Sequence, residues 1–266
     1  MARKSREASR ALSTRRESLR LFGLAGVAAV GGCGSGGSTA KQPSAALPPA
    51  GGMGTPDAPA TGEGGGATCV LRPQQTEGPY FLDGKLDRSD VRPDPRDGVA
   101  APGAPLRLTF RVGRMSGTSC APLPGAIVDI WQCDAQGVYS GFRDFGGLFD
   151  TTGRHFLRGF QTTGSDGACQ FVTIYPGWYP GRSVHIHFKI RATESGRLHE
   201  ITSQLYFPES LSDEVFTRAP YNRHAGRRTL NNADGIFQRG GSDLLLAPTT
   251  EGEGFAATFD VGLQIA

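Results

Sequence analysis

The 266-residue sequence lacks several patterns that would each have indicated a different kind of protein. No Cys-x-x-Cys pair occurs, so a zinc site built from thiolates is not expected. The apolar run from Leu21 to Val30 has about ten residues, half of what a membrane-spanning helix needs. No internal repeat, coiled coil or nucleotide-binding glycine fingerprint is present, which argues against repeat architectures and dinucleotide binding.

An excess of positive charge is also missing from most of the chain. The formal net charge of +3 comes from 28 Lys and Arg against 25 Asp and Glu. Residues 1–32 contain seven of the basic and two of the acidic residues, which leaves 21 against 23, or about −2, for the remainder. No nucleic-acid partner is therefore predicted.

The basic N-terminal segment has the pattern of an export signal. Residues 1–32 place the pair Arg15-Arg16 ahead of a weakly apolar run, which resembles a twin-arginine signal. The run ends in Val30-Gly31-Gly32-Cys33, which resembles a bacterial lipobox in which Cys33 would be lipidated and become the new N-terminus. The alternative is an ordinary cleaved signal followed by an incidental cysteine. We expect an exported, extracytoplasmic protein that is anchored to the membrane through a lipid.

Large apolar residues are scarce in the next segment, residues 33–67, which consists mainly of Gly, Pro, Ala, Ser and Thr. Such a segment cannot bury enough surface to offset the entropy lost on ordering, so it is predicted to be a flexible tether. Residues 68–266 then form the predicted folded domain.

The cysteines of that domain fit an oxidising compartment. Four remain once Cys33 is set aside: Cys69, Cys120, Cys133 and Cys169. An even number in an exported chain predicts two disulfides, and the three possible pairings stay open.

Short apolar or alternating runs separated by Gly, Pro and Asp predict an all-β fold, an antiparallel β-sandwich with long loops. The only helix expected is short, from Ser210 to Thr217. The expected strands are Leu106–Val112, Ala126–Cys133, Gln170–Ile174, Val184–Arg191, Ile201–Phe207 and Phe255–Leu263, with a weaker one at Leu244–Ala247.

The stretch from Thr173 to Ile190 carries the strongest chemical signal. Successive side chains on a strand point to opposite faces, so His185 and His187 share one face while Ile186 and its apolar neighbours share the other. Two imidazoles about 6–7 Å apart along a strand can converge on one ion, which predicts a metal site. The alternative is a pair of structural histidines.

Two tyrosines are candidate partners of the histidines. Tyr139 follows the strand that ends at Cys133, and Tyr179 lies in the turn Pro176-Gly177-Trp178-Tyr179-Pro180-Gly181. A tyrosine in such a turn is more often a packed aromatic residue. The neighbouring histidines favour a ligand instead.

Six segments of this domain resemble the intradiol ring-cleavage dioxygenases, the family of protocatechuate, catechol and hydroxyquinol dioxygenases. The resemblance covers essentially the whole domain and includes the Thr173–Ile190 stretch. Its other segments are Glu77-Gly78-Pro79-Tyr80, Gly125 to Trp131, Gly137-Val138-Tyr139, Phe156-Leu157-Arg158-Gly159 and Gln204-Leu205-Tyr206-Phe207.

The resemblance implies a mononuclear non-haem Fe(III) site with Tyr139, Tyr179, His185 and His187 as ligands. It also implies catalytic roles for Tyr179, which would leave the metal and accept a proton, for Arg182 near the ring, and for Gln204 beside the substrate. Phenolate oxygens suit the hard ferric ion, and two phenolates with one hydroxide would neutralise its charge. An alternative for Arg182 is a surface salt bridge.

The implied reaction uses O2 to cleave a catecholic ring between its two hydroxyl-bearing carbons and gives a muconate-type diacid. The loop from Tyr179 to His185 is shorter than in the cytoplasmic members of the family, so ring substituents are not predicted. Two other hypotheses stay open: a tethered β-sandwich binding module without catalysis, and a hydrolytic zinc enzyme. The oligomeric state is not predicted.

Overall fold

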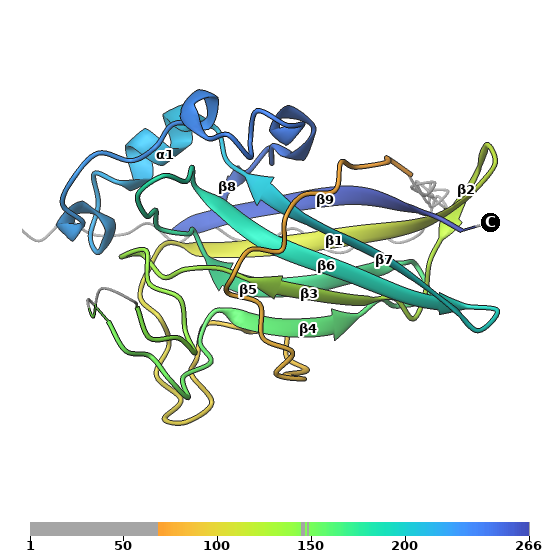
Figure 1. Ribbon diagram of the computed structural model, residues 1–266, viewed down its shortest axis with the longest axis horizontal. Coiled ribbons are helices and arrows are strands. Elements are labelled where there is room, and N and C mark those ends of the chain that lie inside the picture. Colours follow the sequence, from red (N-terminus) through yellow and green to blue (C-terminus); the bar gives the residue numbers. More distant parts are fainter. Residues whose placement is uncertain (1–68, 145–146, 148, 266) are drawn as a thin grey trace, which may run out of the picture. The chain divides into compact units, whose positions relative to one another are not determined.

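The described part of the chain, in a computed structural model, consists of residues 69–144, 147 and 149–265. The predicted export signal, the lipidation of Cys33 and the whole of the predicted tether lie outside these residues. The described residues form two β-sheets with long connections and one α-helix (Figure 1). This is the predicted all-β sandwich.

The first sheet is built around β1 (Pro105–Ser116) and β9 (Gly254–Gln264). Its strand order is β2-β1-β9-β8, and β5 also pairs with β1. β2 covers Ser119–Pro122, β5 covers Ala168–Ile174 and β8 covers Thr249–Glu251. β1 and β9 run parallel, with Leu106 opposite Phe255. Every other strand pair described is antiparallel, as predicted.

The second sheet has the order β4-β3-β6-β7. Its strands are β4 (Arg158–Thr162), β3 (Ile127–Trp131), β6 (His185–Glu194) and β7 (Arg197–Tyr206). The register places Trp131 and Gln204 on either side of His187, and Tyr206 opposite His185. Because residues directly opposite each other share a face, these five side chains lie on one face of the sheet.

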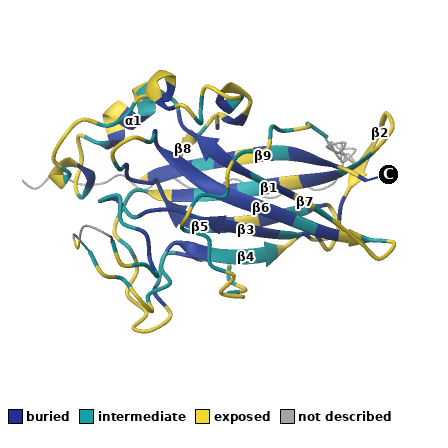
Figure 2. Cartoon of the chain, viewed as in Figure 1, coloured by how far each residue is buried: buried dark blue, intermediate teal, exposed yellow. Residues whose placement is uncertain are grey.

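The main core fills the space between the two sheets, and the central strands are mostly buried (Figure 2). Alternation explains the packing: Leu106, Leu108 and Phe110 point inward from β1. From β6, Phe188 meets Phe110 with ring centroids 5.5 Å apart. The two histidines of β6 therefore point away from the first sheet, toward the outer face of the second.

The extended segment that begins the described chain, and that includes Gln75 and Arg88, covers that outer face. Figure 1 shows it, in orange, crossing in front of the strands of the second sheet. The Gln75 amide donates to the Thr202 carbonyl (3.0 Å) and the Arg88 amide donates to the Phe160 carbonyl (3.1 Å), which fixes the segment on β7 at one point and on β4 at another. Side chains on the outer face, including the histidines, are buried because this segment lies over them.

The helices are short. α1 spans Glu209–Val215, close to the predicted helix, and it follows Pro208 without a side-chain cap. Three 3-10 helices follow at Tyr221–Arg223, Asn231–Ala233 and Gly241–Leu244. Among the described residues, no helix combines the length and the apolar character that crossing a membrane requires.

Two predictions from the sequence were wrong here. Leu244–Ala247 is not a strand: a 3-10 helix ends at Leu244, and Leu245 makes a single isolated bridge to Tyr206. One disulfide is present among the described cysteines where two were predicted. It joins Cys69 to Cys120, while Cys133 and Cys169 are buried thiols that belong to two different core clusters.

Candidate metal centre

Four side chains converge at one end of the outer face. The Nε2 atoms of His185 and His187 lie 3.1 Å apart, and the hydroxyls of Tyr139 and Tyr179 each lie 3.3 Å from His185 Nε2. His185, His187 and Tyr139 are at most 2% exposed, and Tyr179 is half-buried. The four residues that the sequence singled out as ligands are thus brought together.

His185 presents an unprotonated nitrogen to this point, and both histidines are neutral. His185 Nδ1 lies 2.6 Å from the Ser183 carbonyl oxygen, which can only accept, so Nδ1 carries the proton and Nε2 offers its lone pair. Burial, followed by the Arg182 charge, lowers the pKa of His185 to about 3. Burial and the neighbouring His185 also hold the pKa of His187 well below its ordinary value. Both imidazoles are therefore neutral at pH 7.

The phenols behave in the opposite way. Burial, with the nearby Tyr179, raises the pKa of Tyr139 well above its ordinary value. Burial also raises the pKa of Tyr179 to about 12, although Arg182 opposes the shift. Both hydroxyls keep their protons unless a cation lies between them, because a cation favours the deprotonated form.

Two imidazole nitrogens and two phenolic oxygens that meet in this way form a donor set for a single transition-metal cation. In the part of the chain that the structure describes, no three His, Cys, Asp or Glu side chains gather in a metal-binding group. The tyrosines are therefore essential to the donor set. Zinc, whose usual ligands are Cys, His and carboxylates, fits it poorly.

The two tyrosines are carried by turns that press on each other. Gly137, in the turn before Tyr139, has φ of +81°, and a Cβ atom there would lie 2.2 Å from the Trp178 carbonyl oxygen. Gly177, in the turn before Tyr179, would place a Cβ atom 2.3 Å from the Asp134 carbonyl oxygen. Glycine at both positions lets the two turns approach closely enough for the hydroxyls to meet.

Arg182 lies beside the cluster and is mostly buried, so the alternative of a surface salt bridge is wrong. Its Nε donates to Asp234 Oδ2 (2.9 Å), and its side chain is 15% exposed. The other end of its guanidinium donates to Gln204 Oε1, which also accepts from the Tyr206 hydroxyl at 3.1 Å. The predicted residues Arg182 and Gln204 are therefore in direct contact.

Aromatic rings enclose the donor set. Tyr80 stacks on Tyr139 with centroids 4.2 Å apart and planes 13° apart, and Trp131 stacks on His187 at 5.0 Å and 8°. Both rings lie in segments that carried the family resemblance, but neither had been given a role. Tyr175 does not take part in this enclosure: it lies in the main core with its hydroxyl 2.7 Å from Ser212 Oγ.

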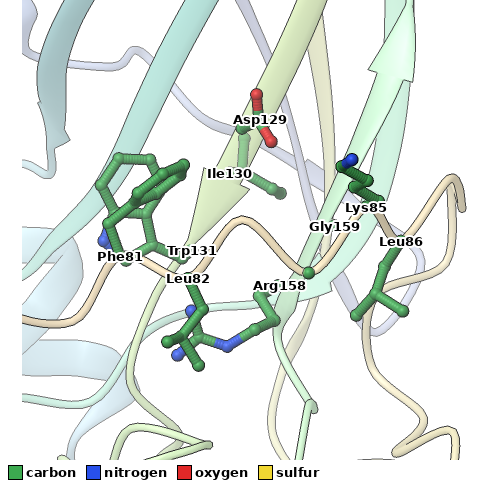
Figure 3. A pocket seen from close by; sticks show the side chains of 10 residues that line it. Phe81, Leu82, Lys85, Leu86, Asp129, Ile130, Trp131, Arg158 and Gly159 are labelled. Carbon is green, nitrogen blue, oxygen red and sulfur yellow. The ribbon is translucent and has the colours of Figure 1, made fainter.

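Trp131 also lines a small cavity (Figure 3). It measures about 10 Å³, room for a single water molecule, and is lined by Phe81, Leu82, Asp129 and Arg158 among others. Trp131 contacts both this cavity and His187. The cavity is too small for an aromatic substrate, and we assign it no role in binding one.

Comparison with known proteins agrees with the geometry. The family described as "Dioxygenase" matches residues 76–234, which include all six residues predicted for the site. An intradiol ring-cleavage dioxygenase from Tetranychus urticae is 32% identical, with a TM-score of 0.62 over 74% of this chain and 95% of that one. The dioxygenase domain of a carbohydrate-binding fusion protein from Streptomyces sp. SirexAA-E is 33% identical, with a TM-score of 0.53 over 74% of this chain and all of that one.

Matches to curated relatives are shorter. A chlorocatechol 1,2-dioxygenase from Rhodococcus opacus is 31% identical over 173 residues, or 58% of this chain and 61% of the relative. A 6-chlorohydroxyquinol 1,2-dioxygenase from Cupriavidus pinatubonensis is 35% identical over 98 residues, 33% of its length. The matches thus span between a third and three fifths of these relatives. The family match and the fold together show that the chain belongs to the intradiol ring-cleavage dioxygenases.

Proposed function

We propose that the protein is an iron(III)-dependent dioxygenase that cleaves a catecholic ring between its two hydroxyl-bearing carbons and yields a muconate-type diacid. The observation that carries this proposal is the convergence of two imidazole nitrogens and two phenolic oxygens at 3.1 to 3.3 Å. His185, His187, Tyr139 and Tyr179 would hold the iron. Bound ferric iron would supply the Lewis acidity that binds both catechol oxygens and makes the ring reactive toward O2.

The two tyrosines differ in their freedom to move. Tyr139 is 1% exposed and lies under Tyr80, whereas Tyr179 is half-buried in a turn that ends at the exposed Gly181. Tyr179 is therefore the phenolate that can leave its place and accept a substrate proton at Oη. Its raised pKa of about 12 makes it a base strong enough to hold that proton.

Arg182 and Gln204 would act on the substrate side of the same cluster. The arginine carries a fixed positive charge close to Tyr179 and is held by Asp234 and Gln204. It would stabilise negative charge that develops on the ring, and removing such a donor typically lowers kcat about 10²–10³-fold. Gln204, whose Nε2 donates to the Thr76 carbonyl at 3.0 Å, fixes the arginine and borders the substrate.

The test uses purified protein and its Tyr139→Phe variant. We expect the wild type to contain iron, to show a visible phenolate-to-iron charge-transfer band, and to consume O2 with a catechol. Y139F should weaken the band, while Tyr175→Phe, which removes a buried hydroxyl in the main core, should leave it unchanged.

Three results would contradict the proposal. A folded wild type without iron or colour would remove its basis. No O2 uptake across a panel of catechol, protocatechuate, hydroxyquinol and larger plant-derived catechols would favour the non-catalytic binding module. A product cleaved beside the diol would refute the intradiol reaction specifically.

A further inference from the structure

Asp234 is a buried carboxylate that accepts hydrogen bonds from several donors close to the candidate metal centre. Its Oδ2 atom accepts from Arg182 Nε, from the Ser183 amide and from the Ser183 hydroxyl, each at 2.9 Å. Its Oδ1 atom accepts from the Ile236 amide at 2.7 Å. The side chain is 1% exposed, and these donors leave the carboxylate no need for water.

Two of these donors lead directly into the site. Arg182 extends from Asp234 to the Oε1 atom of Gln204, so the carboxylate fixes one end of the guanidinium and the amide fixes the other. An arginine side chain has many rotamers, and it keeps one orientation in a pocket when both ends are bound. Asp234 therefore restricts the position of the positive charge.

The second connection runs through the main chain. Asp234 binds both the amide and the hydroxyl of Ser183, and the carbonyl of the same serine accepts from His185 Nδ1 at 2.6 Å. That last contact keeps the proton on Nδ1 and leaves Nε2 free to face the other donors. The orientation of Ser183, and with it the tautomer of His185, depends on Asp234.

We propose that Asp234 is a positioning residue for the reaction: it aims Arg182 at the substrate side of the site and, through Ser183, holds His185 in its ligand orientation. The inference deepens the proposed function and rests on it. It couples the charge-stabilising cation and one ligand to a carboxylate about fifty residues further along the chain.

The decisive variant is Asp234→Asn, which keeps the size of the side chain. It replaces one carboxylate oxygen, a hydrogen-bond acceptor, by an NH2 group that would face the N–H and O–H donors now bound to Asp234. We expect kcat to fall about 10²-fold, as for Arg182→Gln, because the Arg182 guanidinium is then no longer held in position beside the substrate. In the double variant, D234N should add little to the loss of kcat that R182Q causes, since most of its effect on kcat passes through the arginine. The charge-transfer band should also shift, because Ser183 no longer fixes His185.

Asp94 offers a matched control on the same protein. It is fully buried and accepts from Arg154 Nε and from the His155 amide, both at 2.9 Å. These hydrogen bonds involve neither Arg182 nor the four candidate metal ligands. Asp94→Asn should lower the melting temperature as D234N does, but leave kcat and the band unchanged. If D234N does not fold, Asp234→Glu, which keeps the charge and displaces it by one methylene, takes its place in the comparison.

The inference is overturned if the wild type turns over a catechol and the kcat of D234N stays within about twofold of the wild-type value. It is also overturned if the loss of kcat in the double variant equals the product of the losses in D234N and R182Q. Equal losses of kcat in D94N and D234N would also overturn it, because a general loss of stability would then explain both. A wild type without iron and without O2 uptake would instead refute the proposed function, and the inference with it.

Discussion

Gly137→Ala tests whether the close contact of the two tyrosine-bearing turns builds the site. The substitution adds a Cβ atom 2.2 Å from the Trp178 carbonyl oxygen, at a residue whose φ is +81°. The contacted atom belongs to the main chain, so no side-chain rotation can relieve it. One turn must move away from the other, and the distance between the hydroxyls of Tyr139 and Tyr179 must change.

Two other glycines separate the contributions. Gly125 has φ of +77° and open space around a Cβ atom, so Gly125→Ala isolates the backbone cost, about 1 kcal/mol. Gly177 is not in the left-handed region, so Gly177→Ala isolates the close contact, which costs about 1–3 kcal/mol when no relief is available. G137A combines both and should cost about 3 kcal/mol. The entropy that alanine removes from the unfolded chain is shared by all three variants and cancels.

Thermal melting followed by circular dichroism measures these differences. In a domain of this size 1 kcal/mol corresponds to about 2–4 °C, so G125A should melt a few degrees below the wild type and G137A about 6–12 °C below it. The charge-transfer band of the iron-loaded protein should move in G137A and G177A and stay in G125A. A G137A protein that has the same melting temperature as G125A and keeps the wild-type charge-transfer band would refute the argument that the two turns are in close contact.

Two further predictions concern acid and the disulfide. Burial lowers the pKa of His185 to about 3 and that of His187 well below its ordinary value. Below about pH 6.5 the unfolded chain therefore binds protons that the folded chain does not. As the pH is lowered from there toward about pH 3, the free energy of unfolding should decrease by about 1.4 kcal/mol per pH unit for each imidazole. Urea unfolding of metal-free protein at pH 7, 6 and 5 checks this, and a slope that His187→Gln does not reduce would contradict it. Replacing Cys69 and Cys120 by serine opens a loop of 51 residues and should cost about 4 kcal/mol. The charge-transfer band of that variant should not change, and a shifted band would show that the disulfide affects the site.

Local patterns were enough to predict the core of the site. The alternation of β6 placed His185 and His187 on one face, and the structure confirms that Ile186 points the other way, into the core. Both tyrosines lie in turns next to predicted strands, so their approach to the histidines follows from the fold. The metal-ligand roles of all four remain predictions, since they depend on bound iron.

Long-range features were not predictable in the same way. Asp234 carries no motif, and its role appears only because the chain returns to the turn that precedes β6. β4, with the sequence Arg-Gly-Phe-Gln-Thr, lacks the apolar alternation of a strand and forms because β3 supplies its partners. The parallel pairing of β1 with β9 joins the two ends of the domain, which no local pattern specifies.

The disulfide also fixes one end of the sandwich. Cys69 begins the described chain and is tied to Cys120 in β2, next to Arg114, whose side chain pairs with Glu194 at the far end of β6. His185 lies nine residues away along that strand, or about 30 Å. The disulfide therefore ties the start of the described chain to the end of the sandwich that lies opposite the candidate metal centre, and strain at Cys69 would be carried by β1 and β2 before it reached His185.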